Sequence, residues 1–223
     1  MRVEAASVFC YADKLEQAAV SRRAALEDCF QTETYALTSL MGPIDGPEWP
    51  SDAAWLAMHD NDVSRIISDG LSDPWVEPDR PDTGLGLEIF IESPDVQPAQ
   101  DDSLLSLADT WMFPMTAEIS HTLASYQRLS AKLLAGEPLS LRFNIEHIKD
   151  GRGLAGALLH IPEHLSKVQT AFGPIALVAA TLLTVDELRW LGGRGEAGRR
   201  ELLSRLYENH IGTRSLVNRA SVL

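Results

Sequence analysis

The feature that most constrains the fold of this chain is its longest apolar run, Ile175–Leu183, which only Thr181 interrupts. Gly173-Pro174 precedes the run, and Thr184 begins a capping-box spacing with Glu187 directly after it. A run of this length between a turn and a helix start is typical of a central strand that is buried on both faces. The sequence therefore predicts a sheet built around this strand, with a helix following at once.

Hydrophobic periodicity predicts further elements before and after this strand. Helices are expected over residues 12–31, through Trp55–Met58, and over residues 101–108, 115–134, 185–191 and 196–207, with 115–134 the longest. Strands are expected at 35–41, 63–68, 86–92, 139–143, 155–161 and 214–217. Residues 86–92 alternate apolar and polar side chains most clearly, which predicts a strand with one solvated face. Together these elements indicate one α/β (α+β) domain with a central mixed β-sheet flanked by helices.

Length and cysteine content favour a cytoplasmic protein with no membrane partner. A chain of 223 residues can bury a core of its own, and two cysteines fit a reducing compartment. The apolar run is shorter than the roughly 20 residues that cross a bilayer as a helix. The N-terminus carries Glu4 and no long apolar segment, which is unlike a signal peptide.

Charge is distributed unevenly along the chain. Residues 1–110 contain 22 Asp and Glu against 6 Lys and Arg, whereas residues 111–223 contain 10 against 13. Such an acidic half repels phosphate backbones, so nucleic acid is not an expected partner, and a basic protein is. The alternative, that the acids are solvated and only keep the protein soluble, stays open.

Several short motifs occur in an order that resembles the conserved domain of the suppressor of fused family. Members of that family carry a GLSDLY segment, a GFGFEL strand, a QTPFG turn and a T-x-E-E-L helix start. The corresponding segments here are GLSDPW at 70–75, GLGLEI at 84–89, QTAFG at 169–173 and TVDEL at 184–188. The resemblance spans roughly residues 50–220. It implies a suppressor of fused-like domain over residues 46–223, with the N-terminal helix and first strand, residues 1–45, as part of the same domain.

The resemblance implies a protein-binding domain and not an enzyme. Animal members look like two-lobed proteins that sequester a transcription factor by clamping an extended peptide; this chain ends soon after the first lobe, so the whole clamp is not expected. Short bacterial relatives are commonly immunity proteins of toxin systems, a role that suits an acidic surface facing a basic toxin. Asp69, Ala171 and Pro74-Trp75 depart from the family pattern, which leaves the identity of the partner open.

The predicted partner-binding residues lie in the acidic loop between the strands at 63–68 and 86–92. They combine one aromatic side chain with carboxylates, as interface contacts with a basic protein require: Asp69, Asp73, Trp75, Glu77, Asp79 and Asp82. The other reading is that Trp75 covers the core and the acids are solvated.

Two alternative functions remain open. An extended peptide could pair with an exposed sheet edge beside Gly86–Glu92, or an uncharacterised hydrolase could use Glu146, His147 or His160. No cofactor and no metal is predicted. His160 and His164 have a spacing that can bind zinc on a helix, but Pro162 between them opposes a regular helix.

Overall fold

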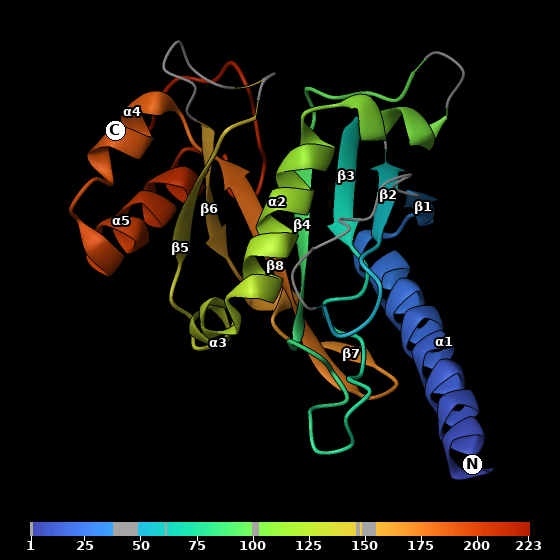
Figure 1. Ribbon diagram of the computed structural model, residues 1–223. Helices are drawn as coiled ribbons and strands as arrows, with labels where there is room; N and C mark the ends of the chain where they lie inside the picture. Colours follow the sequence, from blue (N-terminus) through green and yellow to red (C-terminus); the bar gives the residue numbers. More distant parts are fainter. Residues whose placement is uncertain (1, 38–48, 61, 100–102, 146–147, 149–154) are drawn as a thin grey trace.

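The computed structural model describes residues 2–37, 49–60, 62–99, 103–145, 148 and 155–223. Its centre is a mixed β-sheet with the strand order β1-β2-β3-β4-β8-β6-β5, and β7 pairs with the beginning of β8 (Figure 1). The strands are β1 (Tyr35–Leu37), β2 (Trp55–Asp60), β3 (Val63–Ser68), β4 (Leu87–Ser93), β5 (Leu139–Phe143), β6 (Ala155–His160), β7 (Val168–Thr170) and β8 (Gly173–Leu182). The expectation of an α/β domain with a mixed sheet is confirmed.

The central strand is β8, as the apolar run predicts. It pairs in parallel with β4 and antiparallel with β6, and its residues from Ile175 to Leu182 are all buried. Thr184 and Glu187 form the capping box: the Glu187 N–H donates to the Thr184 hydroxyl at 3.3 Å, and the Thr184 N–H donates to the Glu187 carboxylate at 2.9 Å. The strand therefore passes directly into α4 (Val185–Trp190).

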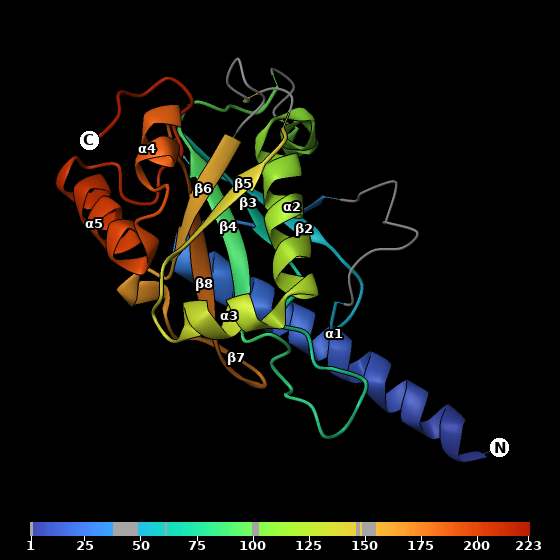
Figure 2. The same cartoon turned by 60° about the vertical axis from the view of Figure 1, so that its left-hand side comes forward.

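Helices cover both faces of the sheet. On one face lie η1 (Leu104–Asp109), α2 (Met112–Ser125) and α3 (Gln127–Leu134), and the side chains of α2 fill the larger apolar core. The other face carries α1 (Arg2–Phe30), η2 (Glu163–Leu165), α4 and α5 (Gly195–Glu208). Figure 2 shows α1 and α2 on opposite sides of the sheet, with the N-terminal turns of α1 extending beyond the rest of the molecule.

The expectations that β4 has a solvated face and lies at a sheet edge are both wrong. Leu87, Ile89 and Ile91 face the α2 core, but Phe90 and Glu88 on the opposite side are also buried, because α1 packs there. β3 and β8 pair with the two edges of β4. Strand addition beside Gly86–Glu92 is therefore excluded in this fold.

Several expected elements differ in type or extent. Residues 55–58 form the start of β2 and not a helix, because alternate side chains pack into the two cores on opposite faces of the sheet: Trp55 and Ala57 on the α2 side, and Leu56 and Met58 on the α1 side. The longest helix is α1, with 29 residues, and not the segment 115–134, which is divided at Tyr126, whose φ and ψ are −125° and 69°. Of the helix expected at 101–108, residues 104–108 lie in the 3-10 helix η1, and residues 101–102 lie outside the described residues. The predicted strand at 214–217 is reduced to one bridge between Glu92 and Arg214.

The helix expected at 12–31 is α1, which begins ten residues earlier, at Arg2. The remaining predicted strands and helices are found close to their expected positions. Residues 38–41 of the first predicted strand and the turn at 149–153 lie outside the described residues. In the described part of the chain, no helix is both long enough and apolar enough to cross a membrane.

Candidate functional site

The loop that joins β3 to β4, residues 69–86, contains all six predicted partner-binding residues, and the structure divides them into two groups. Asp69, Asp73 and Trp75 are buried, with exposed fractions of 3%, 6% and 4%. The other three residues are exposed: Glu77, Asp79 and Asp82. We call Asp69, Asp73 and the buried Glu88 of β4 the inner acids. We call the exposed Glu77, Asp79 and Asp82 the outer acids.

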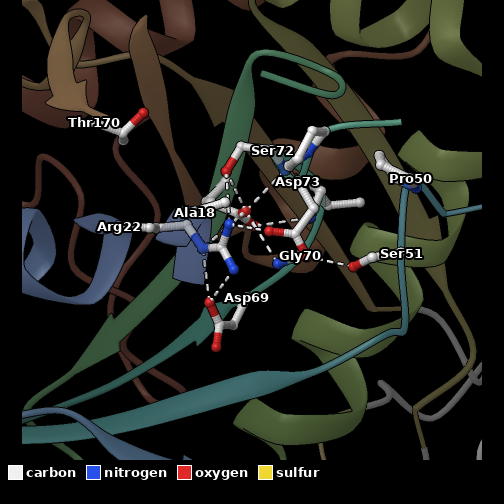
Figure 3. Close-up of polar contacts among 12 residues, drawn as sticks. Ala18, Arg22, Pro50, Ser51, Asp69, Gly70, Ser72, Asp73 and Thr170 are labelled. Atoms are coloured by element: carbon white, nitrogen blue, oxygen red, sulfur yellow. Dashed lines mark hydrogen bonds and ion pairs between the residues drawn. The ribbon is translucent and has the colours of Figure 1, made fainter. Parts of the chain in front are cut away.

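Arg22 of α1 holds the inner acids together, and Figure 3 shows its guanidinium between Asp69 and Asp73. Its guanidinium lies 2.6 Å from an Asp69 oxygen, 2.5 Å from an Asp73 oxygen and 3.6 Å from a Glu88 oxygen. Only 2% of the Arg22 side chain is exposed, so these attractions act with little screening by water. Arg23, which is partly exposed, adds a second cation 2.8 Å from Asp69.

Glu88 links this cluster to the backbone of the loop. Its carboxylate accepts the N–H groups of Gly70 and Ser72 at 3.1 and 2.9 Å. It also accepts the hydroxyl groups of Ser68 and Ser72 at 2.5 and 2.6 Å. Buried carboxylates need such donors, because an unpaired buried charge is costly. The GLSD segment and the GLGLE segment are therefore parts of one network.

Two glycines allow the loop to close tightly around this network. Gly70 has a φ of +146°, and a Cβ there would lie 2.8 Å from the Asp52 carbonyl oxygen. Gly84 has a φ of +54°, and a Cβ there would lie 2.4 Å from the Asp73 carbonyl oxygen. Other residues are disfavoured at both positions by the backbone conformation and by the lack of space.

Burial and pairing act in opposite directions on the ionisation of this cluster. Burial lowers the pKa of Arg22, but Glu88, Asp69 and Asp73 outweigh it and raise that pKa above its ordinary value. Burial raises the pKa of Glu88, while Arg22 and the serine hydroxyls oppose that rise. Arg22 therefore remains charged, and the cluster acts as a structural clamp between α1 and the loop.

The outer part of the loop is fixed at several points. The Arg80 guanidinium stacks 3.2 Å from the centre of the Trp75 ring, which contributes a cation–π attraction. The Tyr11 hydroxyl donates to the Pro74 carbonyl at 3.0 Å, and the Lys14 ammonium lies 2.5 Å from Asp82. Backbone turns bond Arg80 to Glu77 and Gly84 to Pro81. The outer acids are thus presented on an anchored loop, which extends below the sheet in Figure 1.

The turn between β7 and β8 lies beside the middle turns of α1, near the residues that anchor the β3–β4 loop. The Ala171 N–H donates to the Ser21 hydroxyl at 3.1 Å, and the Lys14 ammonium lies 5.6 Å from the centre of the Phe172 ring. Three of the segments that carry the sequence resemblance, 70–75, 84–89 and 169–173, therefore meet at α1.

Sequence reasoning did not identify Arg22 and placed Glu88 on a solvated face. A signal for Arg22 was present, because it lies four residues from both Ala18 and Leu26, the two most buried apolar positions in the part of α1 whose burial is described, residues 11–30. An arginine in the middle of an apolar helical stripe indicates a buried partner of opposite charge. Glu88 gave no local signal, because its strand alternates as a half-exposed strand does.

The other sequence candidates are placed differently. Trp49, Trp55 and Trp111 join Trp75 in the core on the α2 face. His160 is buried on β6, and its Nε2 lies 2.9 Å from the Tyr207 hydroxyl. Glu146 and His147 lie outside the described residues. Within the described part of the chain, no three His, Cys, Asp or Glu side chains gather as a metal site would require.

Comparison with known proteins supports the fold. A crystal structure of the Sufu–Fu complex matches with a TM-score of 0.58 and 15% identity, over 92% of this chain and 92% of that chain. The crystal structure of Drosophila Suppressor of Fused matches with a TM-score of 0.54 and 13% identity, over 92% of this chain and 51% of that chain. No family model and no curated protein sequence matches. The chain has a suppressor of fused-like fold.

Proposed function

We propose that this chain is a non-enzymatic protein-binding domain that presents the outer acids, Glu77, Asp79 and Asp82, to a basic protein partner in the cytoplasm. The observation that carries the proposal is an anchored loop with three exposed carboxylates at its outer end. A loop already held in one conformation loses little entropy on binding, which favours affinity. Its charge attracts a basic surface and accelerates encounter.

The inner acids and Trp75 contribute to this function indirectly. They are buried and paired with the fold, so they shape the loop while the outer acids meet the partner. Val76, which is 62% exposed, adds apolar surface beside the outer acids. Interfaces commonly combine an apolar contact with a charged rim. The fold likeness to a protein crystallised in a complex with Fu is consistent with a protein partner.

The finer role that we propose is that of an immunity protein, which occludes a basic toxin domain. Many toxins that act on nucleic acid carry basic surfaces, and an acidic loop competes with the nucleic acid for such a surface. Expression of the chain should then protect cells against a toxin encoded beside it. Absence of protection by a well-expressed chain would leave the sequestration of a basic regulatory protein as the role of the loop.

Charge reversal of the outer acids tests the binding proposal. The variant Glu77→Lys, Asp79→Lys, Asp82→Lys and the wild-type chain are used to capture proteins from the native host, and the affinity of the captured partner is measured over a range of salt concentrations. We expect the wild type to retain a basic protein and the variant to bind it about 10- to 100-fold more weakly at low salt.

The matched control reverses three exposed acids on α5, Glu196, Glu201 and Glu208, which leaves the total charge change equal. This control should bind the partner as tightly as the wild type does, because we expect the position of the acids, and not the net charge of the chain, to determine the affinity. Equal weakening by both triple variants, or no weakening by either, would contradict recognition by the loop.

A second candidate function is capture of an extended peptide by strand addition at β5. In the described part of the chain β5 pairs only with β6 and ends the sheet on one side, and with five residues it offers a longer edge than the three residues of β1 at the other end. Binding of a peptide there should protect the β5 amides from hydrogen exchange and should tolerate salt. Binding that leaves the β5 amides unprotected would eliminate this candidate.

A further inference from the structure

A second region, which shares no residue with the acidic loop, forms a surface pocket of about 510 Å³ where the end of β6 and η2 meet α5. This pocket, called the cavity below, is open to solvent, and His164, Ser204 and Tyr207 in its lining are exposed. Its polar lining includes His160 and His164 from the β6 side and Ser204 and Tyr207 from α5. Ile161 and Leu203 supply apolar surface. Cavities of roughly 300–1,000 Å³ with an apolar wall and a few convergent polar groups are typical of small-molecule sites.

Either His160 or Tyr207 can donate the hydrogen bond between them. The burial of the His160 ring determines which of the two is the donor. Burial lowers the pKa of His160 to about 4, so its ring is neutral at pH 7 and carries one proton. The Nδ1 atom is buried, and no acceptor among the described residues reaches it. A proton there would be a buried donor without a partner, which costs free energy. The proton therefore belongs on Nε2, which donates to the Tyr207 oxygen at 2.9 Å.

This tautomer of His160 determines whether the Tyr207 hydroxyl can donate a hydrogen bond into the cavity. Because its oxygen accepts from His160, its own hydrogen is directed away from that ring. Tyr207 is 47% exposed, and its partial burial, with a contribution from Glu92, raises its pKa, so the phenol keeps its proton at pH 7. Ser204 lies three residues before Tyr207 on the same side of α5 and provides a second hydroxyl. The cavity thus presents O–H donors beside apolar side chains.

The charge at the rim limits the kind of acceptor that fits. Glu163 also lines the cavity and is exposed. A negative ligand would be repelled by this carboxylate, whereas a neutral carbonyl oxygen accepts from Tyr207 without that penalty. We propose that this cavity binds a small neutral ligand in which a carbonyl oxygen, accepting from Tyr207 and Ser204, is joined to an apolar body that packs on Ile161 and Leu203. The proposal is independent of partner binding by the acidic loop.

Binding of simple probes tests this assignment by NMR titration of the full chain. Phenylacetamide carries a neutral carbonyl on an aromatic body, phenylacetate carries a charged carboxylate, and ethylbenzene is neutral and carries no carbonyl. We expect phenylacetamide to bind with a Kd on the order of 1 mM, as its size allows. Phenylacetate should bind more weakly, and ethylbenzene should not bind at this site. Equal binding of ethylbenzene, or no binding of phenylacetamide, would overturn the proposal.

Tyr207→Phe removes the donor but keeps the aromatic ring. It should weaken phenylacetamide about tenfold, as loss of one hydrogen bond does. Tyr126→Phe removes an exposed phenol at the break between α2 and α3 and should leave binding unchanged. Unchanged binding by the Tyr207→Phe variant would overturn the proposed contact.

The tautomer of His160 can be measured without any ligand, from the ¹⁵N chemical shifts of the ring. We expect the proton on Nε2, and a proton on Nδ1 would contradict the proposed direction of the Tyr207 hydrogen. A short capped peptide, acetyl-glycyl-phenylalanine amide, distinguishes the source of the carbonyl. If it displaces phenylacetamide, a peptide group can supply the acceptor; if only phenylacetamide binds, the natural ligand is a free small molecule.

Discussion

Ionisable side chains are buried in two regions of this molecule, and their charge state differs between the two: charged in one region and neutral in the other. At α1, Arg22 remains charged because three carboxylates surround it. Beside α5, His160 remains neutral because burial lowers the pKa of its ring and its hydrogen-bond partner, the Tyr207 hydroxyl, carries no charge. Paired charges fix the loop that carries the outer acids, whereas the neutral histidine leaves a tyrosine hydrogen available to a cavity.

The largest expected effect comes from removing the central cation. Arg22→Met leaves buried carboxylates without their counter-charge and should lower the free energy of unfolding by about 3–5 kcal/mol, measured by urea denaturation. Arg23→Met, on the neighbouring and partly exposed arginine, should cost less than about 1 kcal/mol. Similar losses for the two variants would show that burial of the charge is not what makes Arg22 important.

The pH dependence of the free energy of unfolding should reveal the neutral, buried His160. The pKa of His160 is depressed in the folded chain, from 6.5 to about 4, so the unfolded chain takes up the proton first as pH falls. The stabilising contribution is complete above pH 6.5 and is lost as pH falls toward 4, up to about 3 kcal/mol. His160→Gln should remove this part of the acid destabilisation, and His164→Gln on an exposed position should not. Parallel pH profiles for wild type and His160→Gln would contradict a neutral, buried ring.

An intermediate effect is expected from a donor to the inner acids. Ser72→Ala removes a hydroxyl that bonds the Glu88 carboxylate at 2.6 Å and should cost about 2 kcal/mol in chemical denaturation. Ser166→Ala, whose exposed hydroxyl bonds only a local backbone carbonyl, should have almost no effect. A stability unchanged in Ser72→Ala would mean that the other donors are sufficient for Glu88.

The smallest effect on stability is expected for the outer acids. Replacing Glu77, Asp79 and Asp82 by their amides should change the free energy of unfolding by less than about 0.5 kcal/mol, because these side chains are exposed and the ion pair between Asp82 and Lys14 lies at the surface. Thermal unfolding should therefore show a nearly unchanged midpoint while binding of a basic partner is weakened. A loss as large as that of Ser72→Ala would place the outer acids in the scaffold as well.

The sequence by itself determined the features that depend on near neighbours. The apolar run identified β8, and the spacing of Thr184 and Glu187 identified the start of α4, because both signals lie within a few consecutive residues. The order of the GLSD, GLGLE and QTAFG segments indicated the suppressor of fused-like fold. The loop containing Glu77, Asp79 and Asp82 could also be located, since prolines and acids mark exposed turns.

Only the tertiary structure decided which acids are buried. Asp73 and Glu77 look alike in the sequence, yet one is paired with Arg22 and the other is exposed. Glu88 follows a strand pattern that predicts solvent, but α1, far away in the chain, covers that face and supplies the counter-charge. The spacing of apolar residues along a strand or helix shows which face of that element a residue occupies. It does not show which distant element packs on that face. The free energy of a buried charge depends on that distant partner, so the clamp formed by Arg22 became visible only in the folded chain.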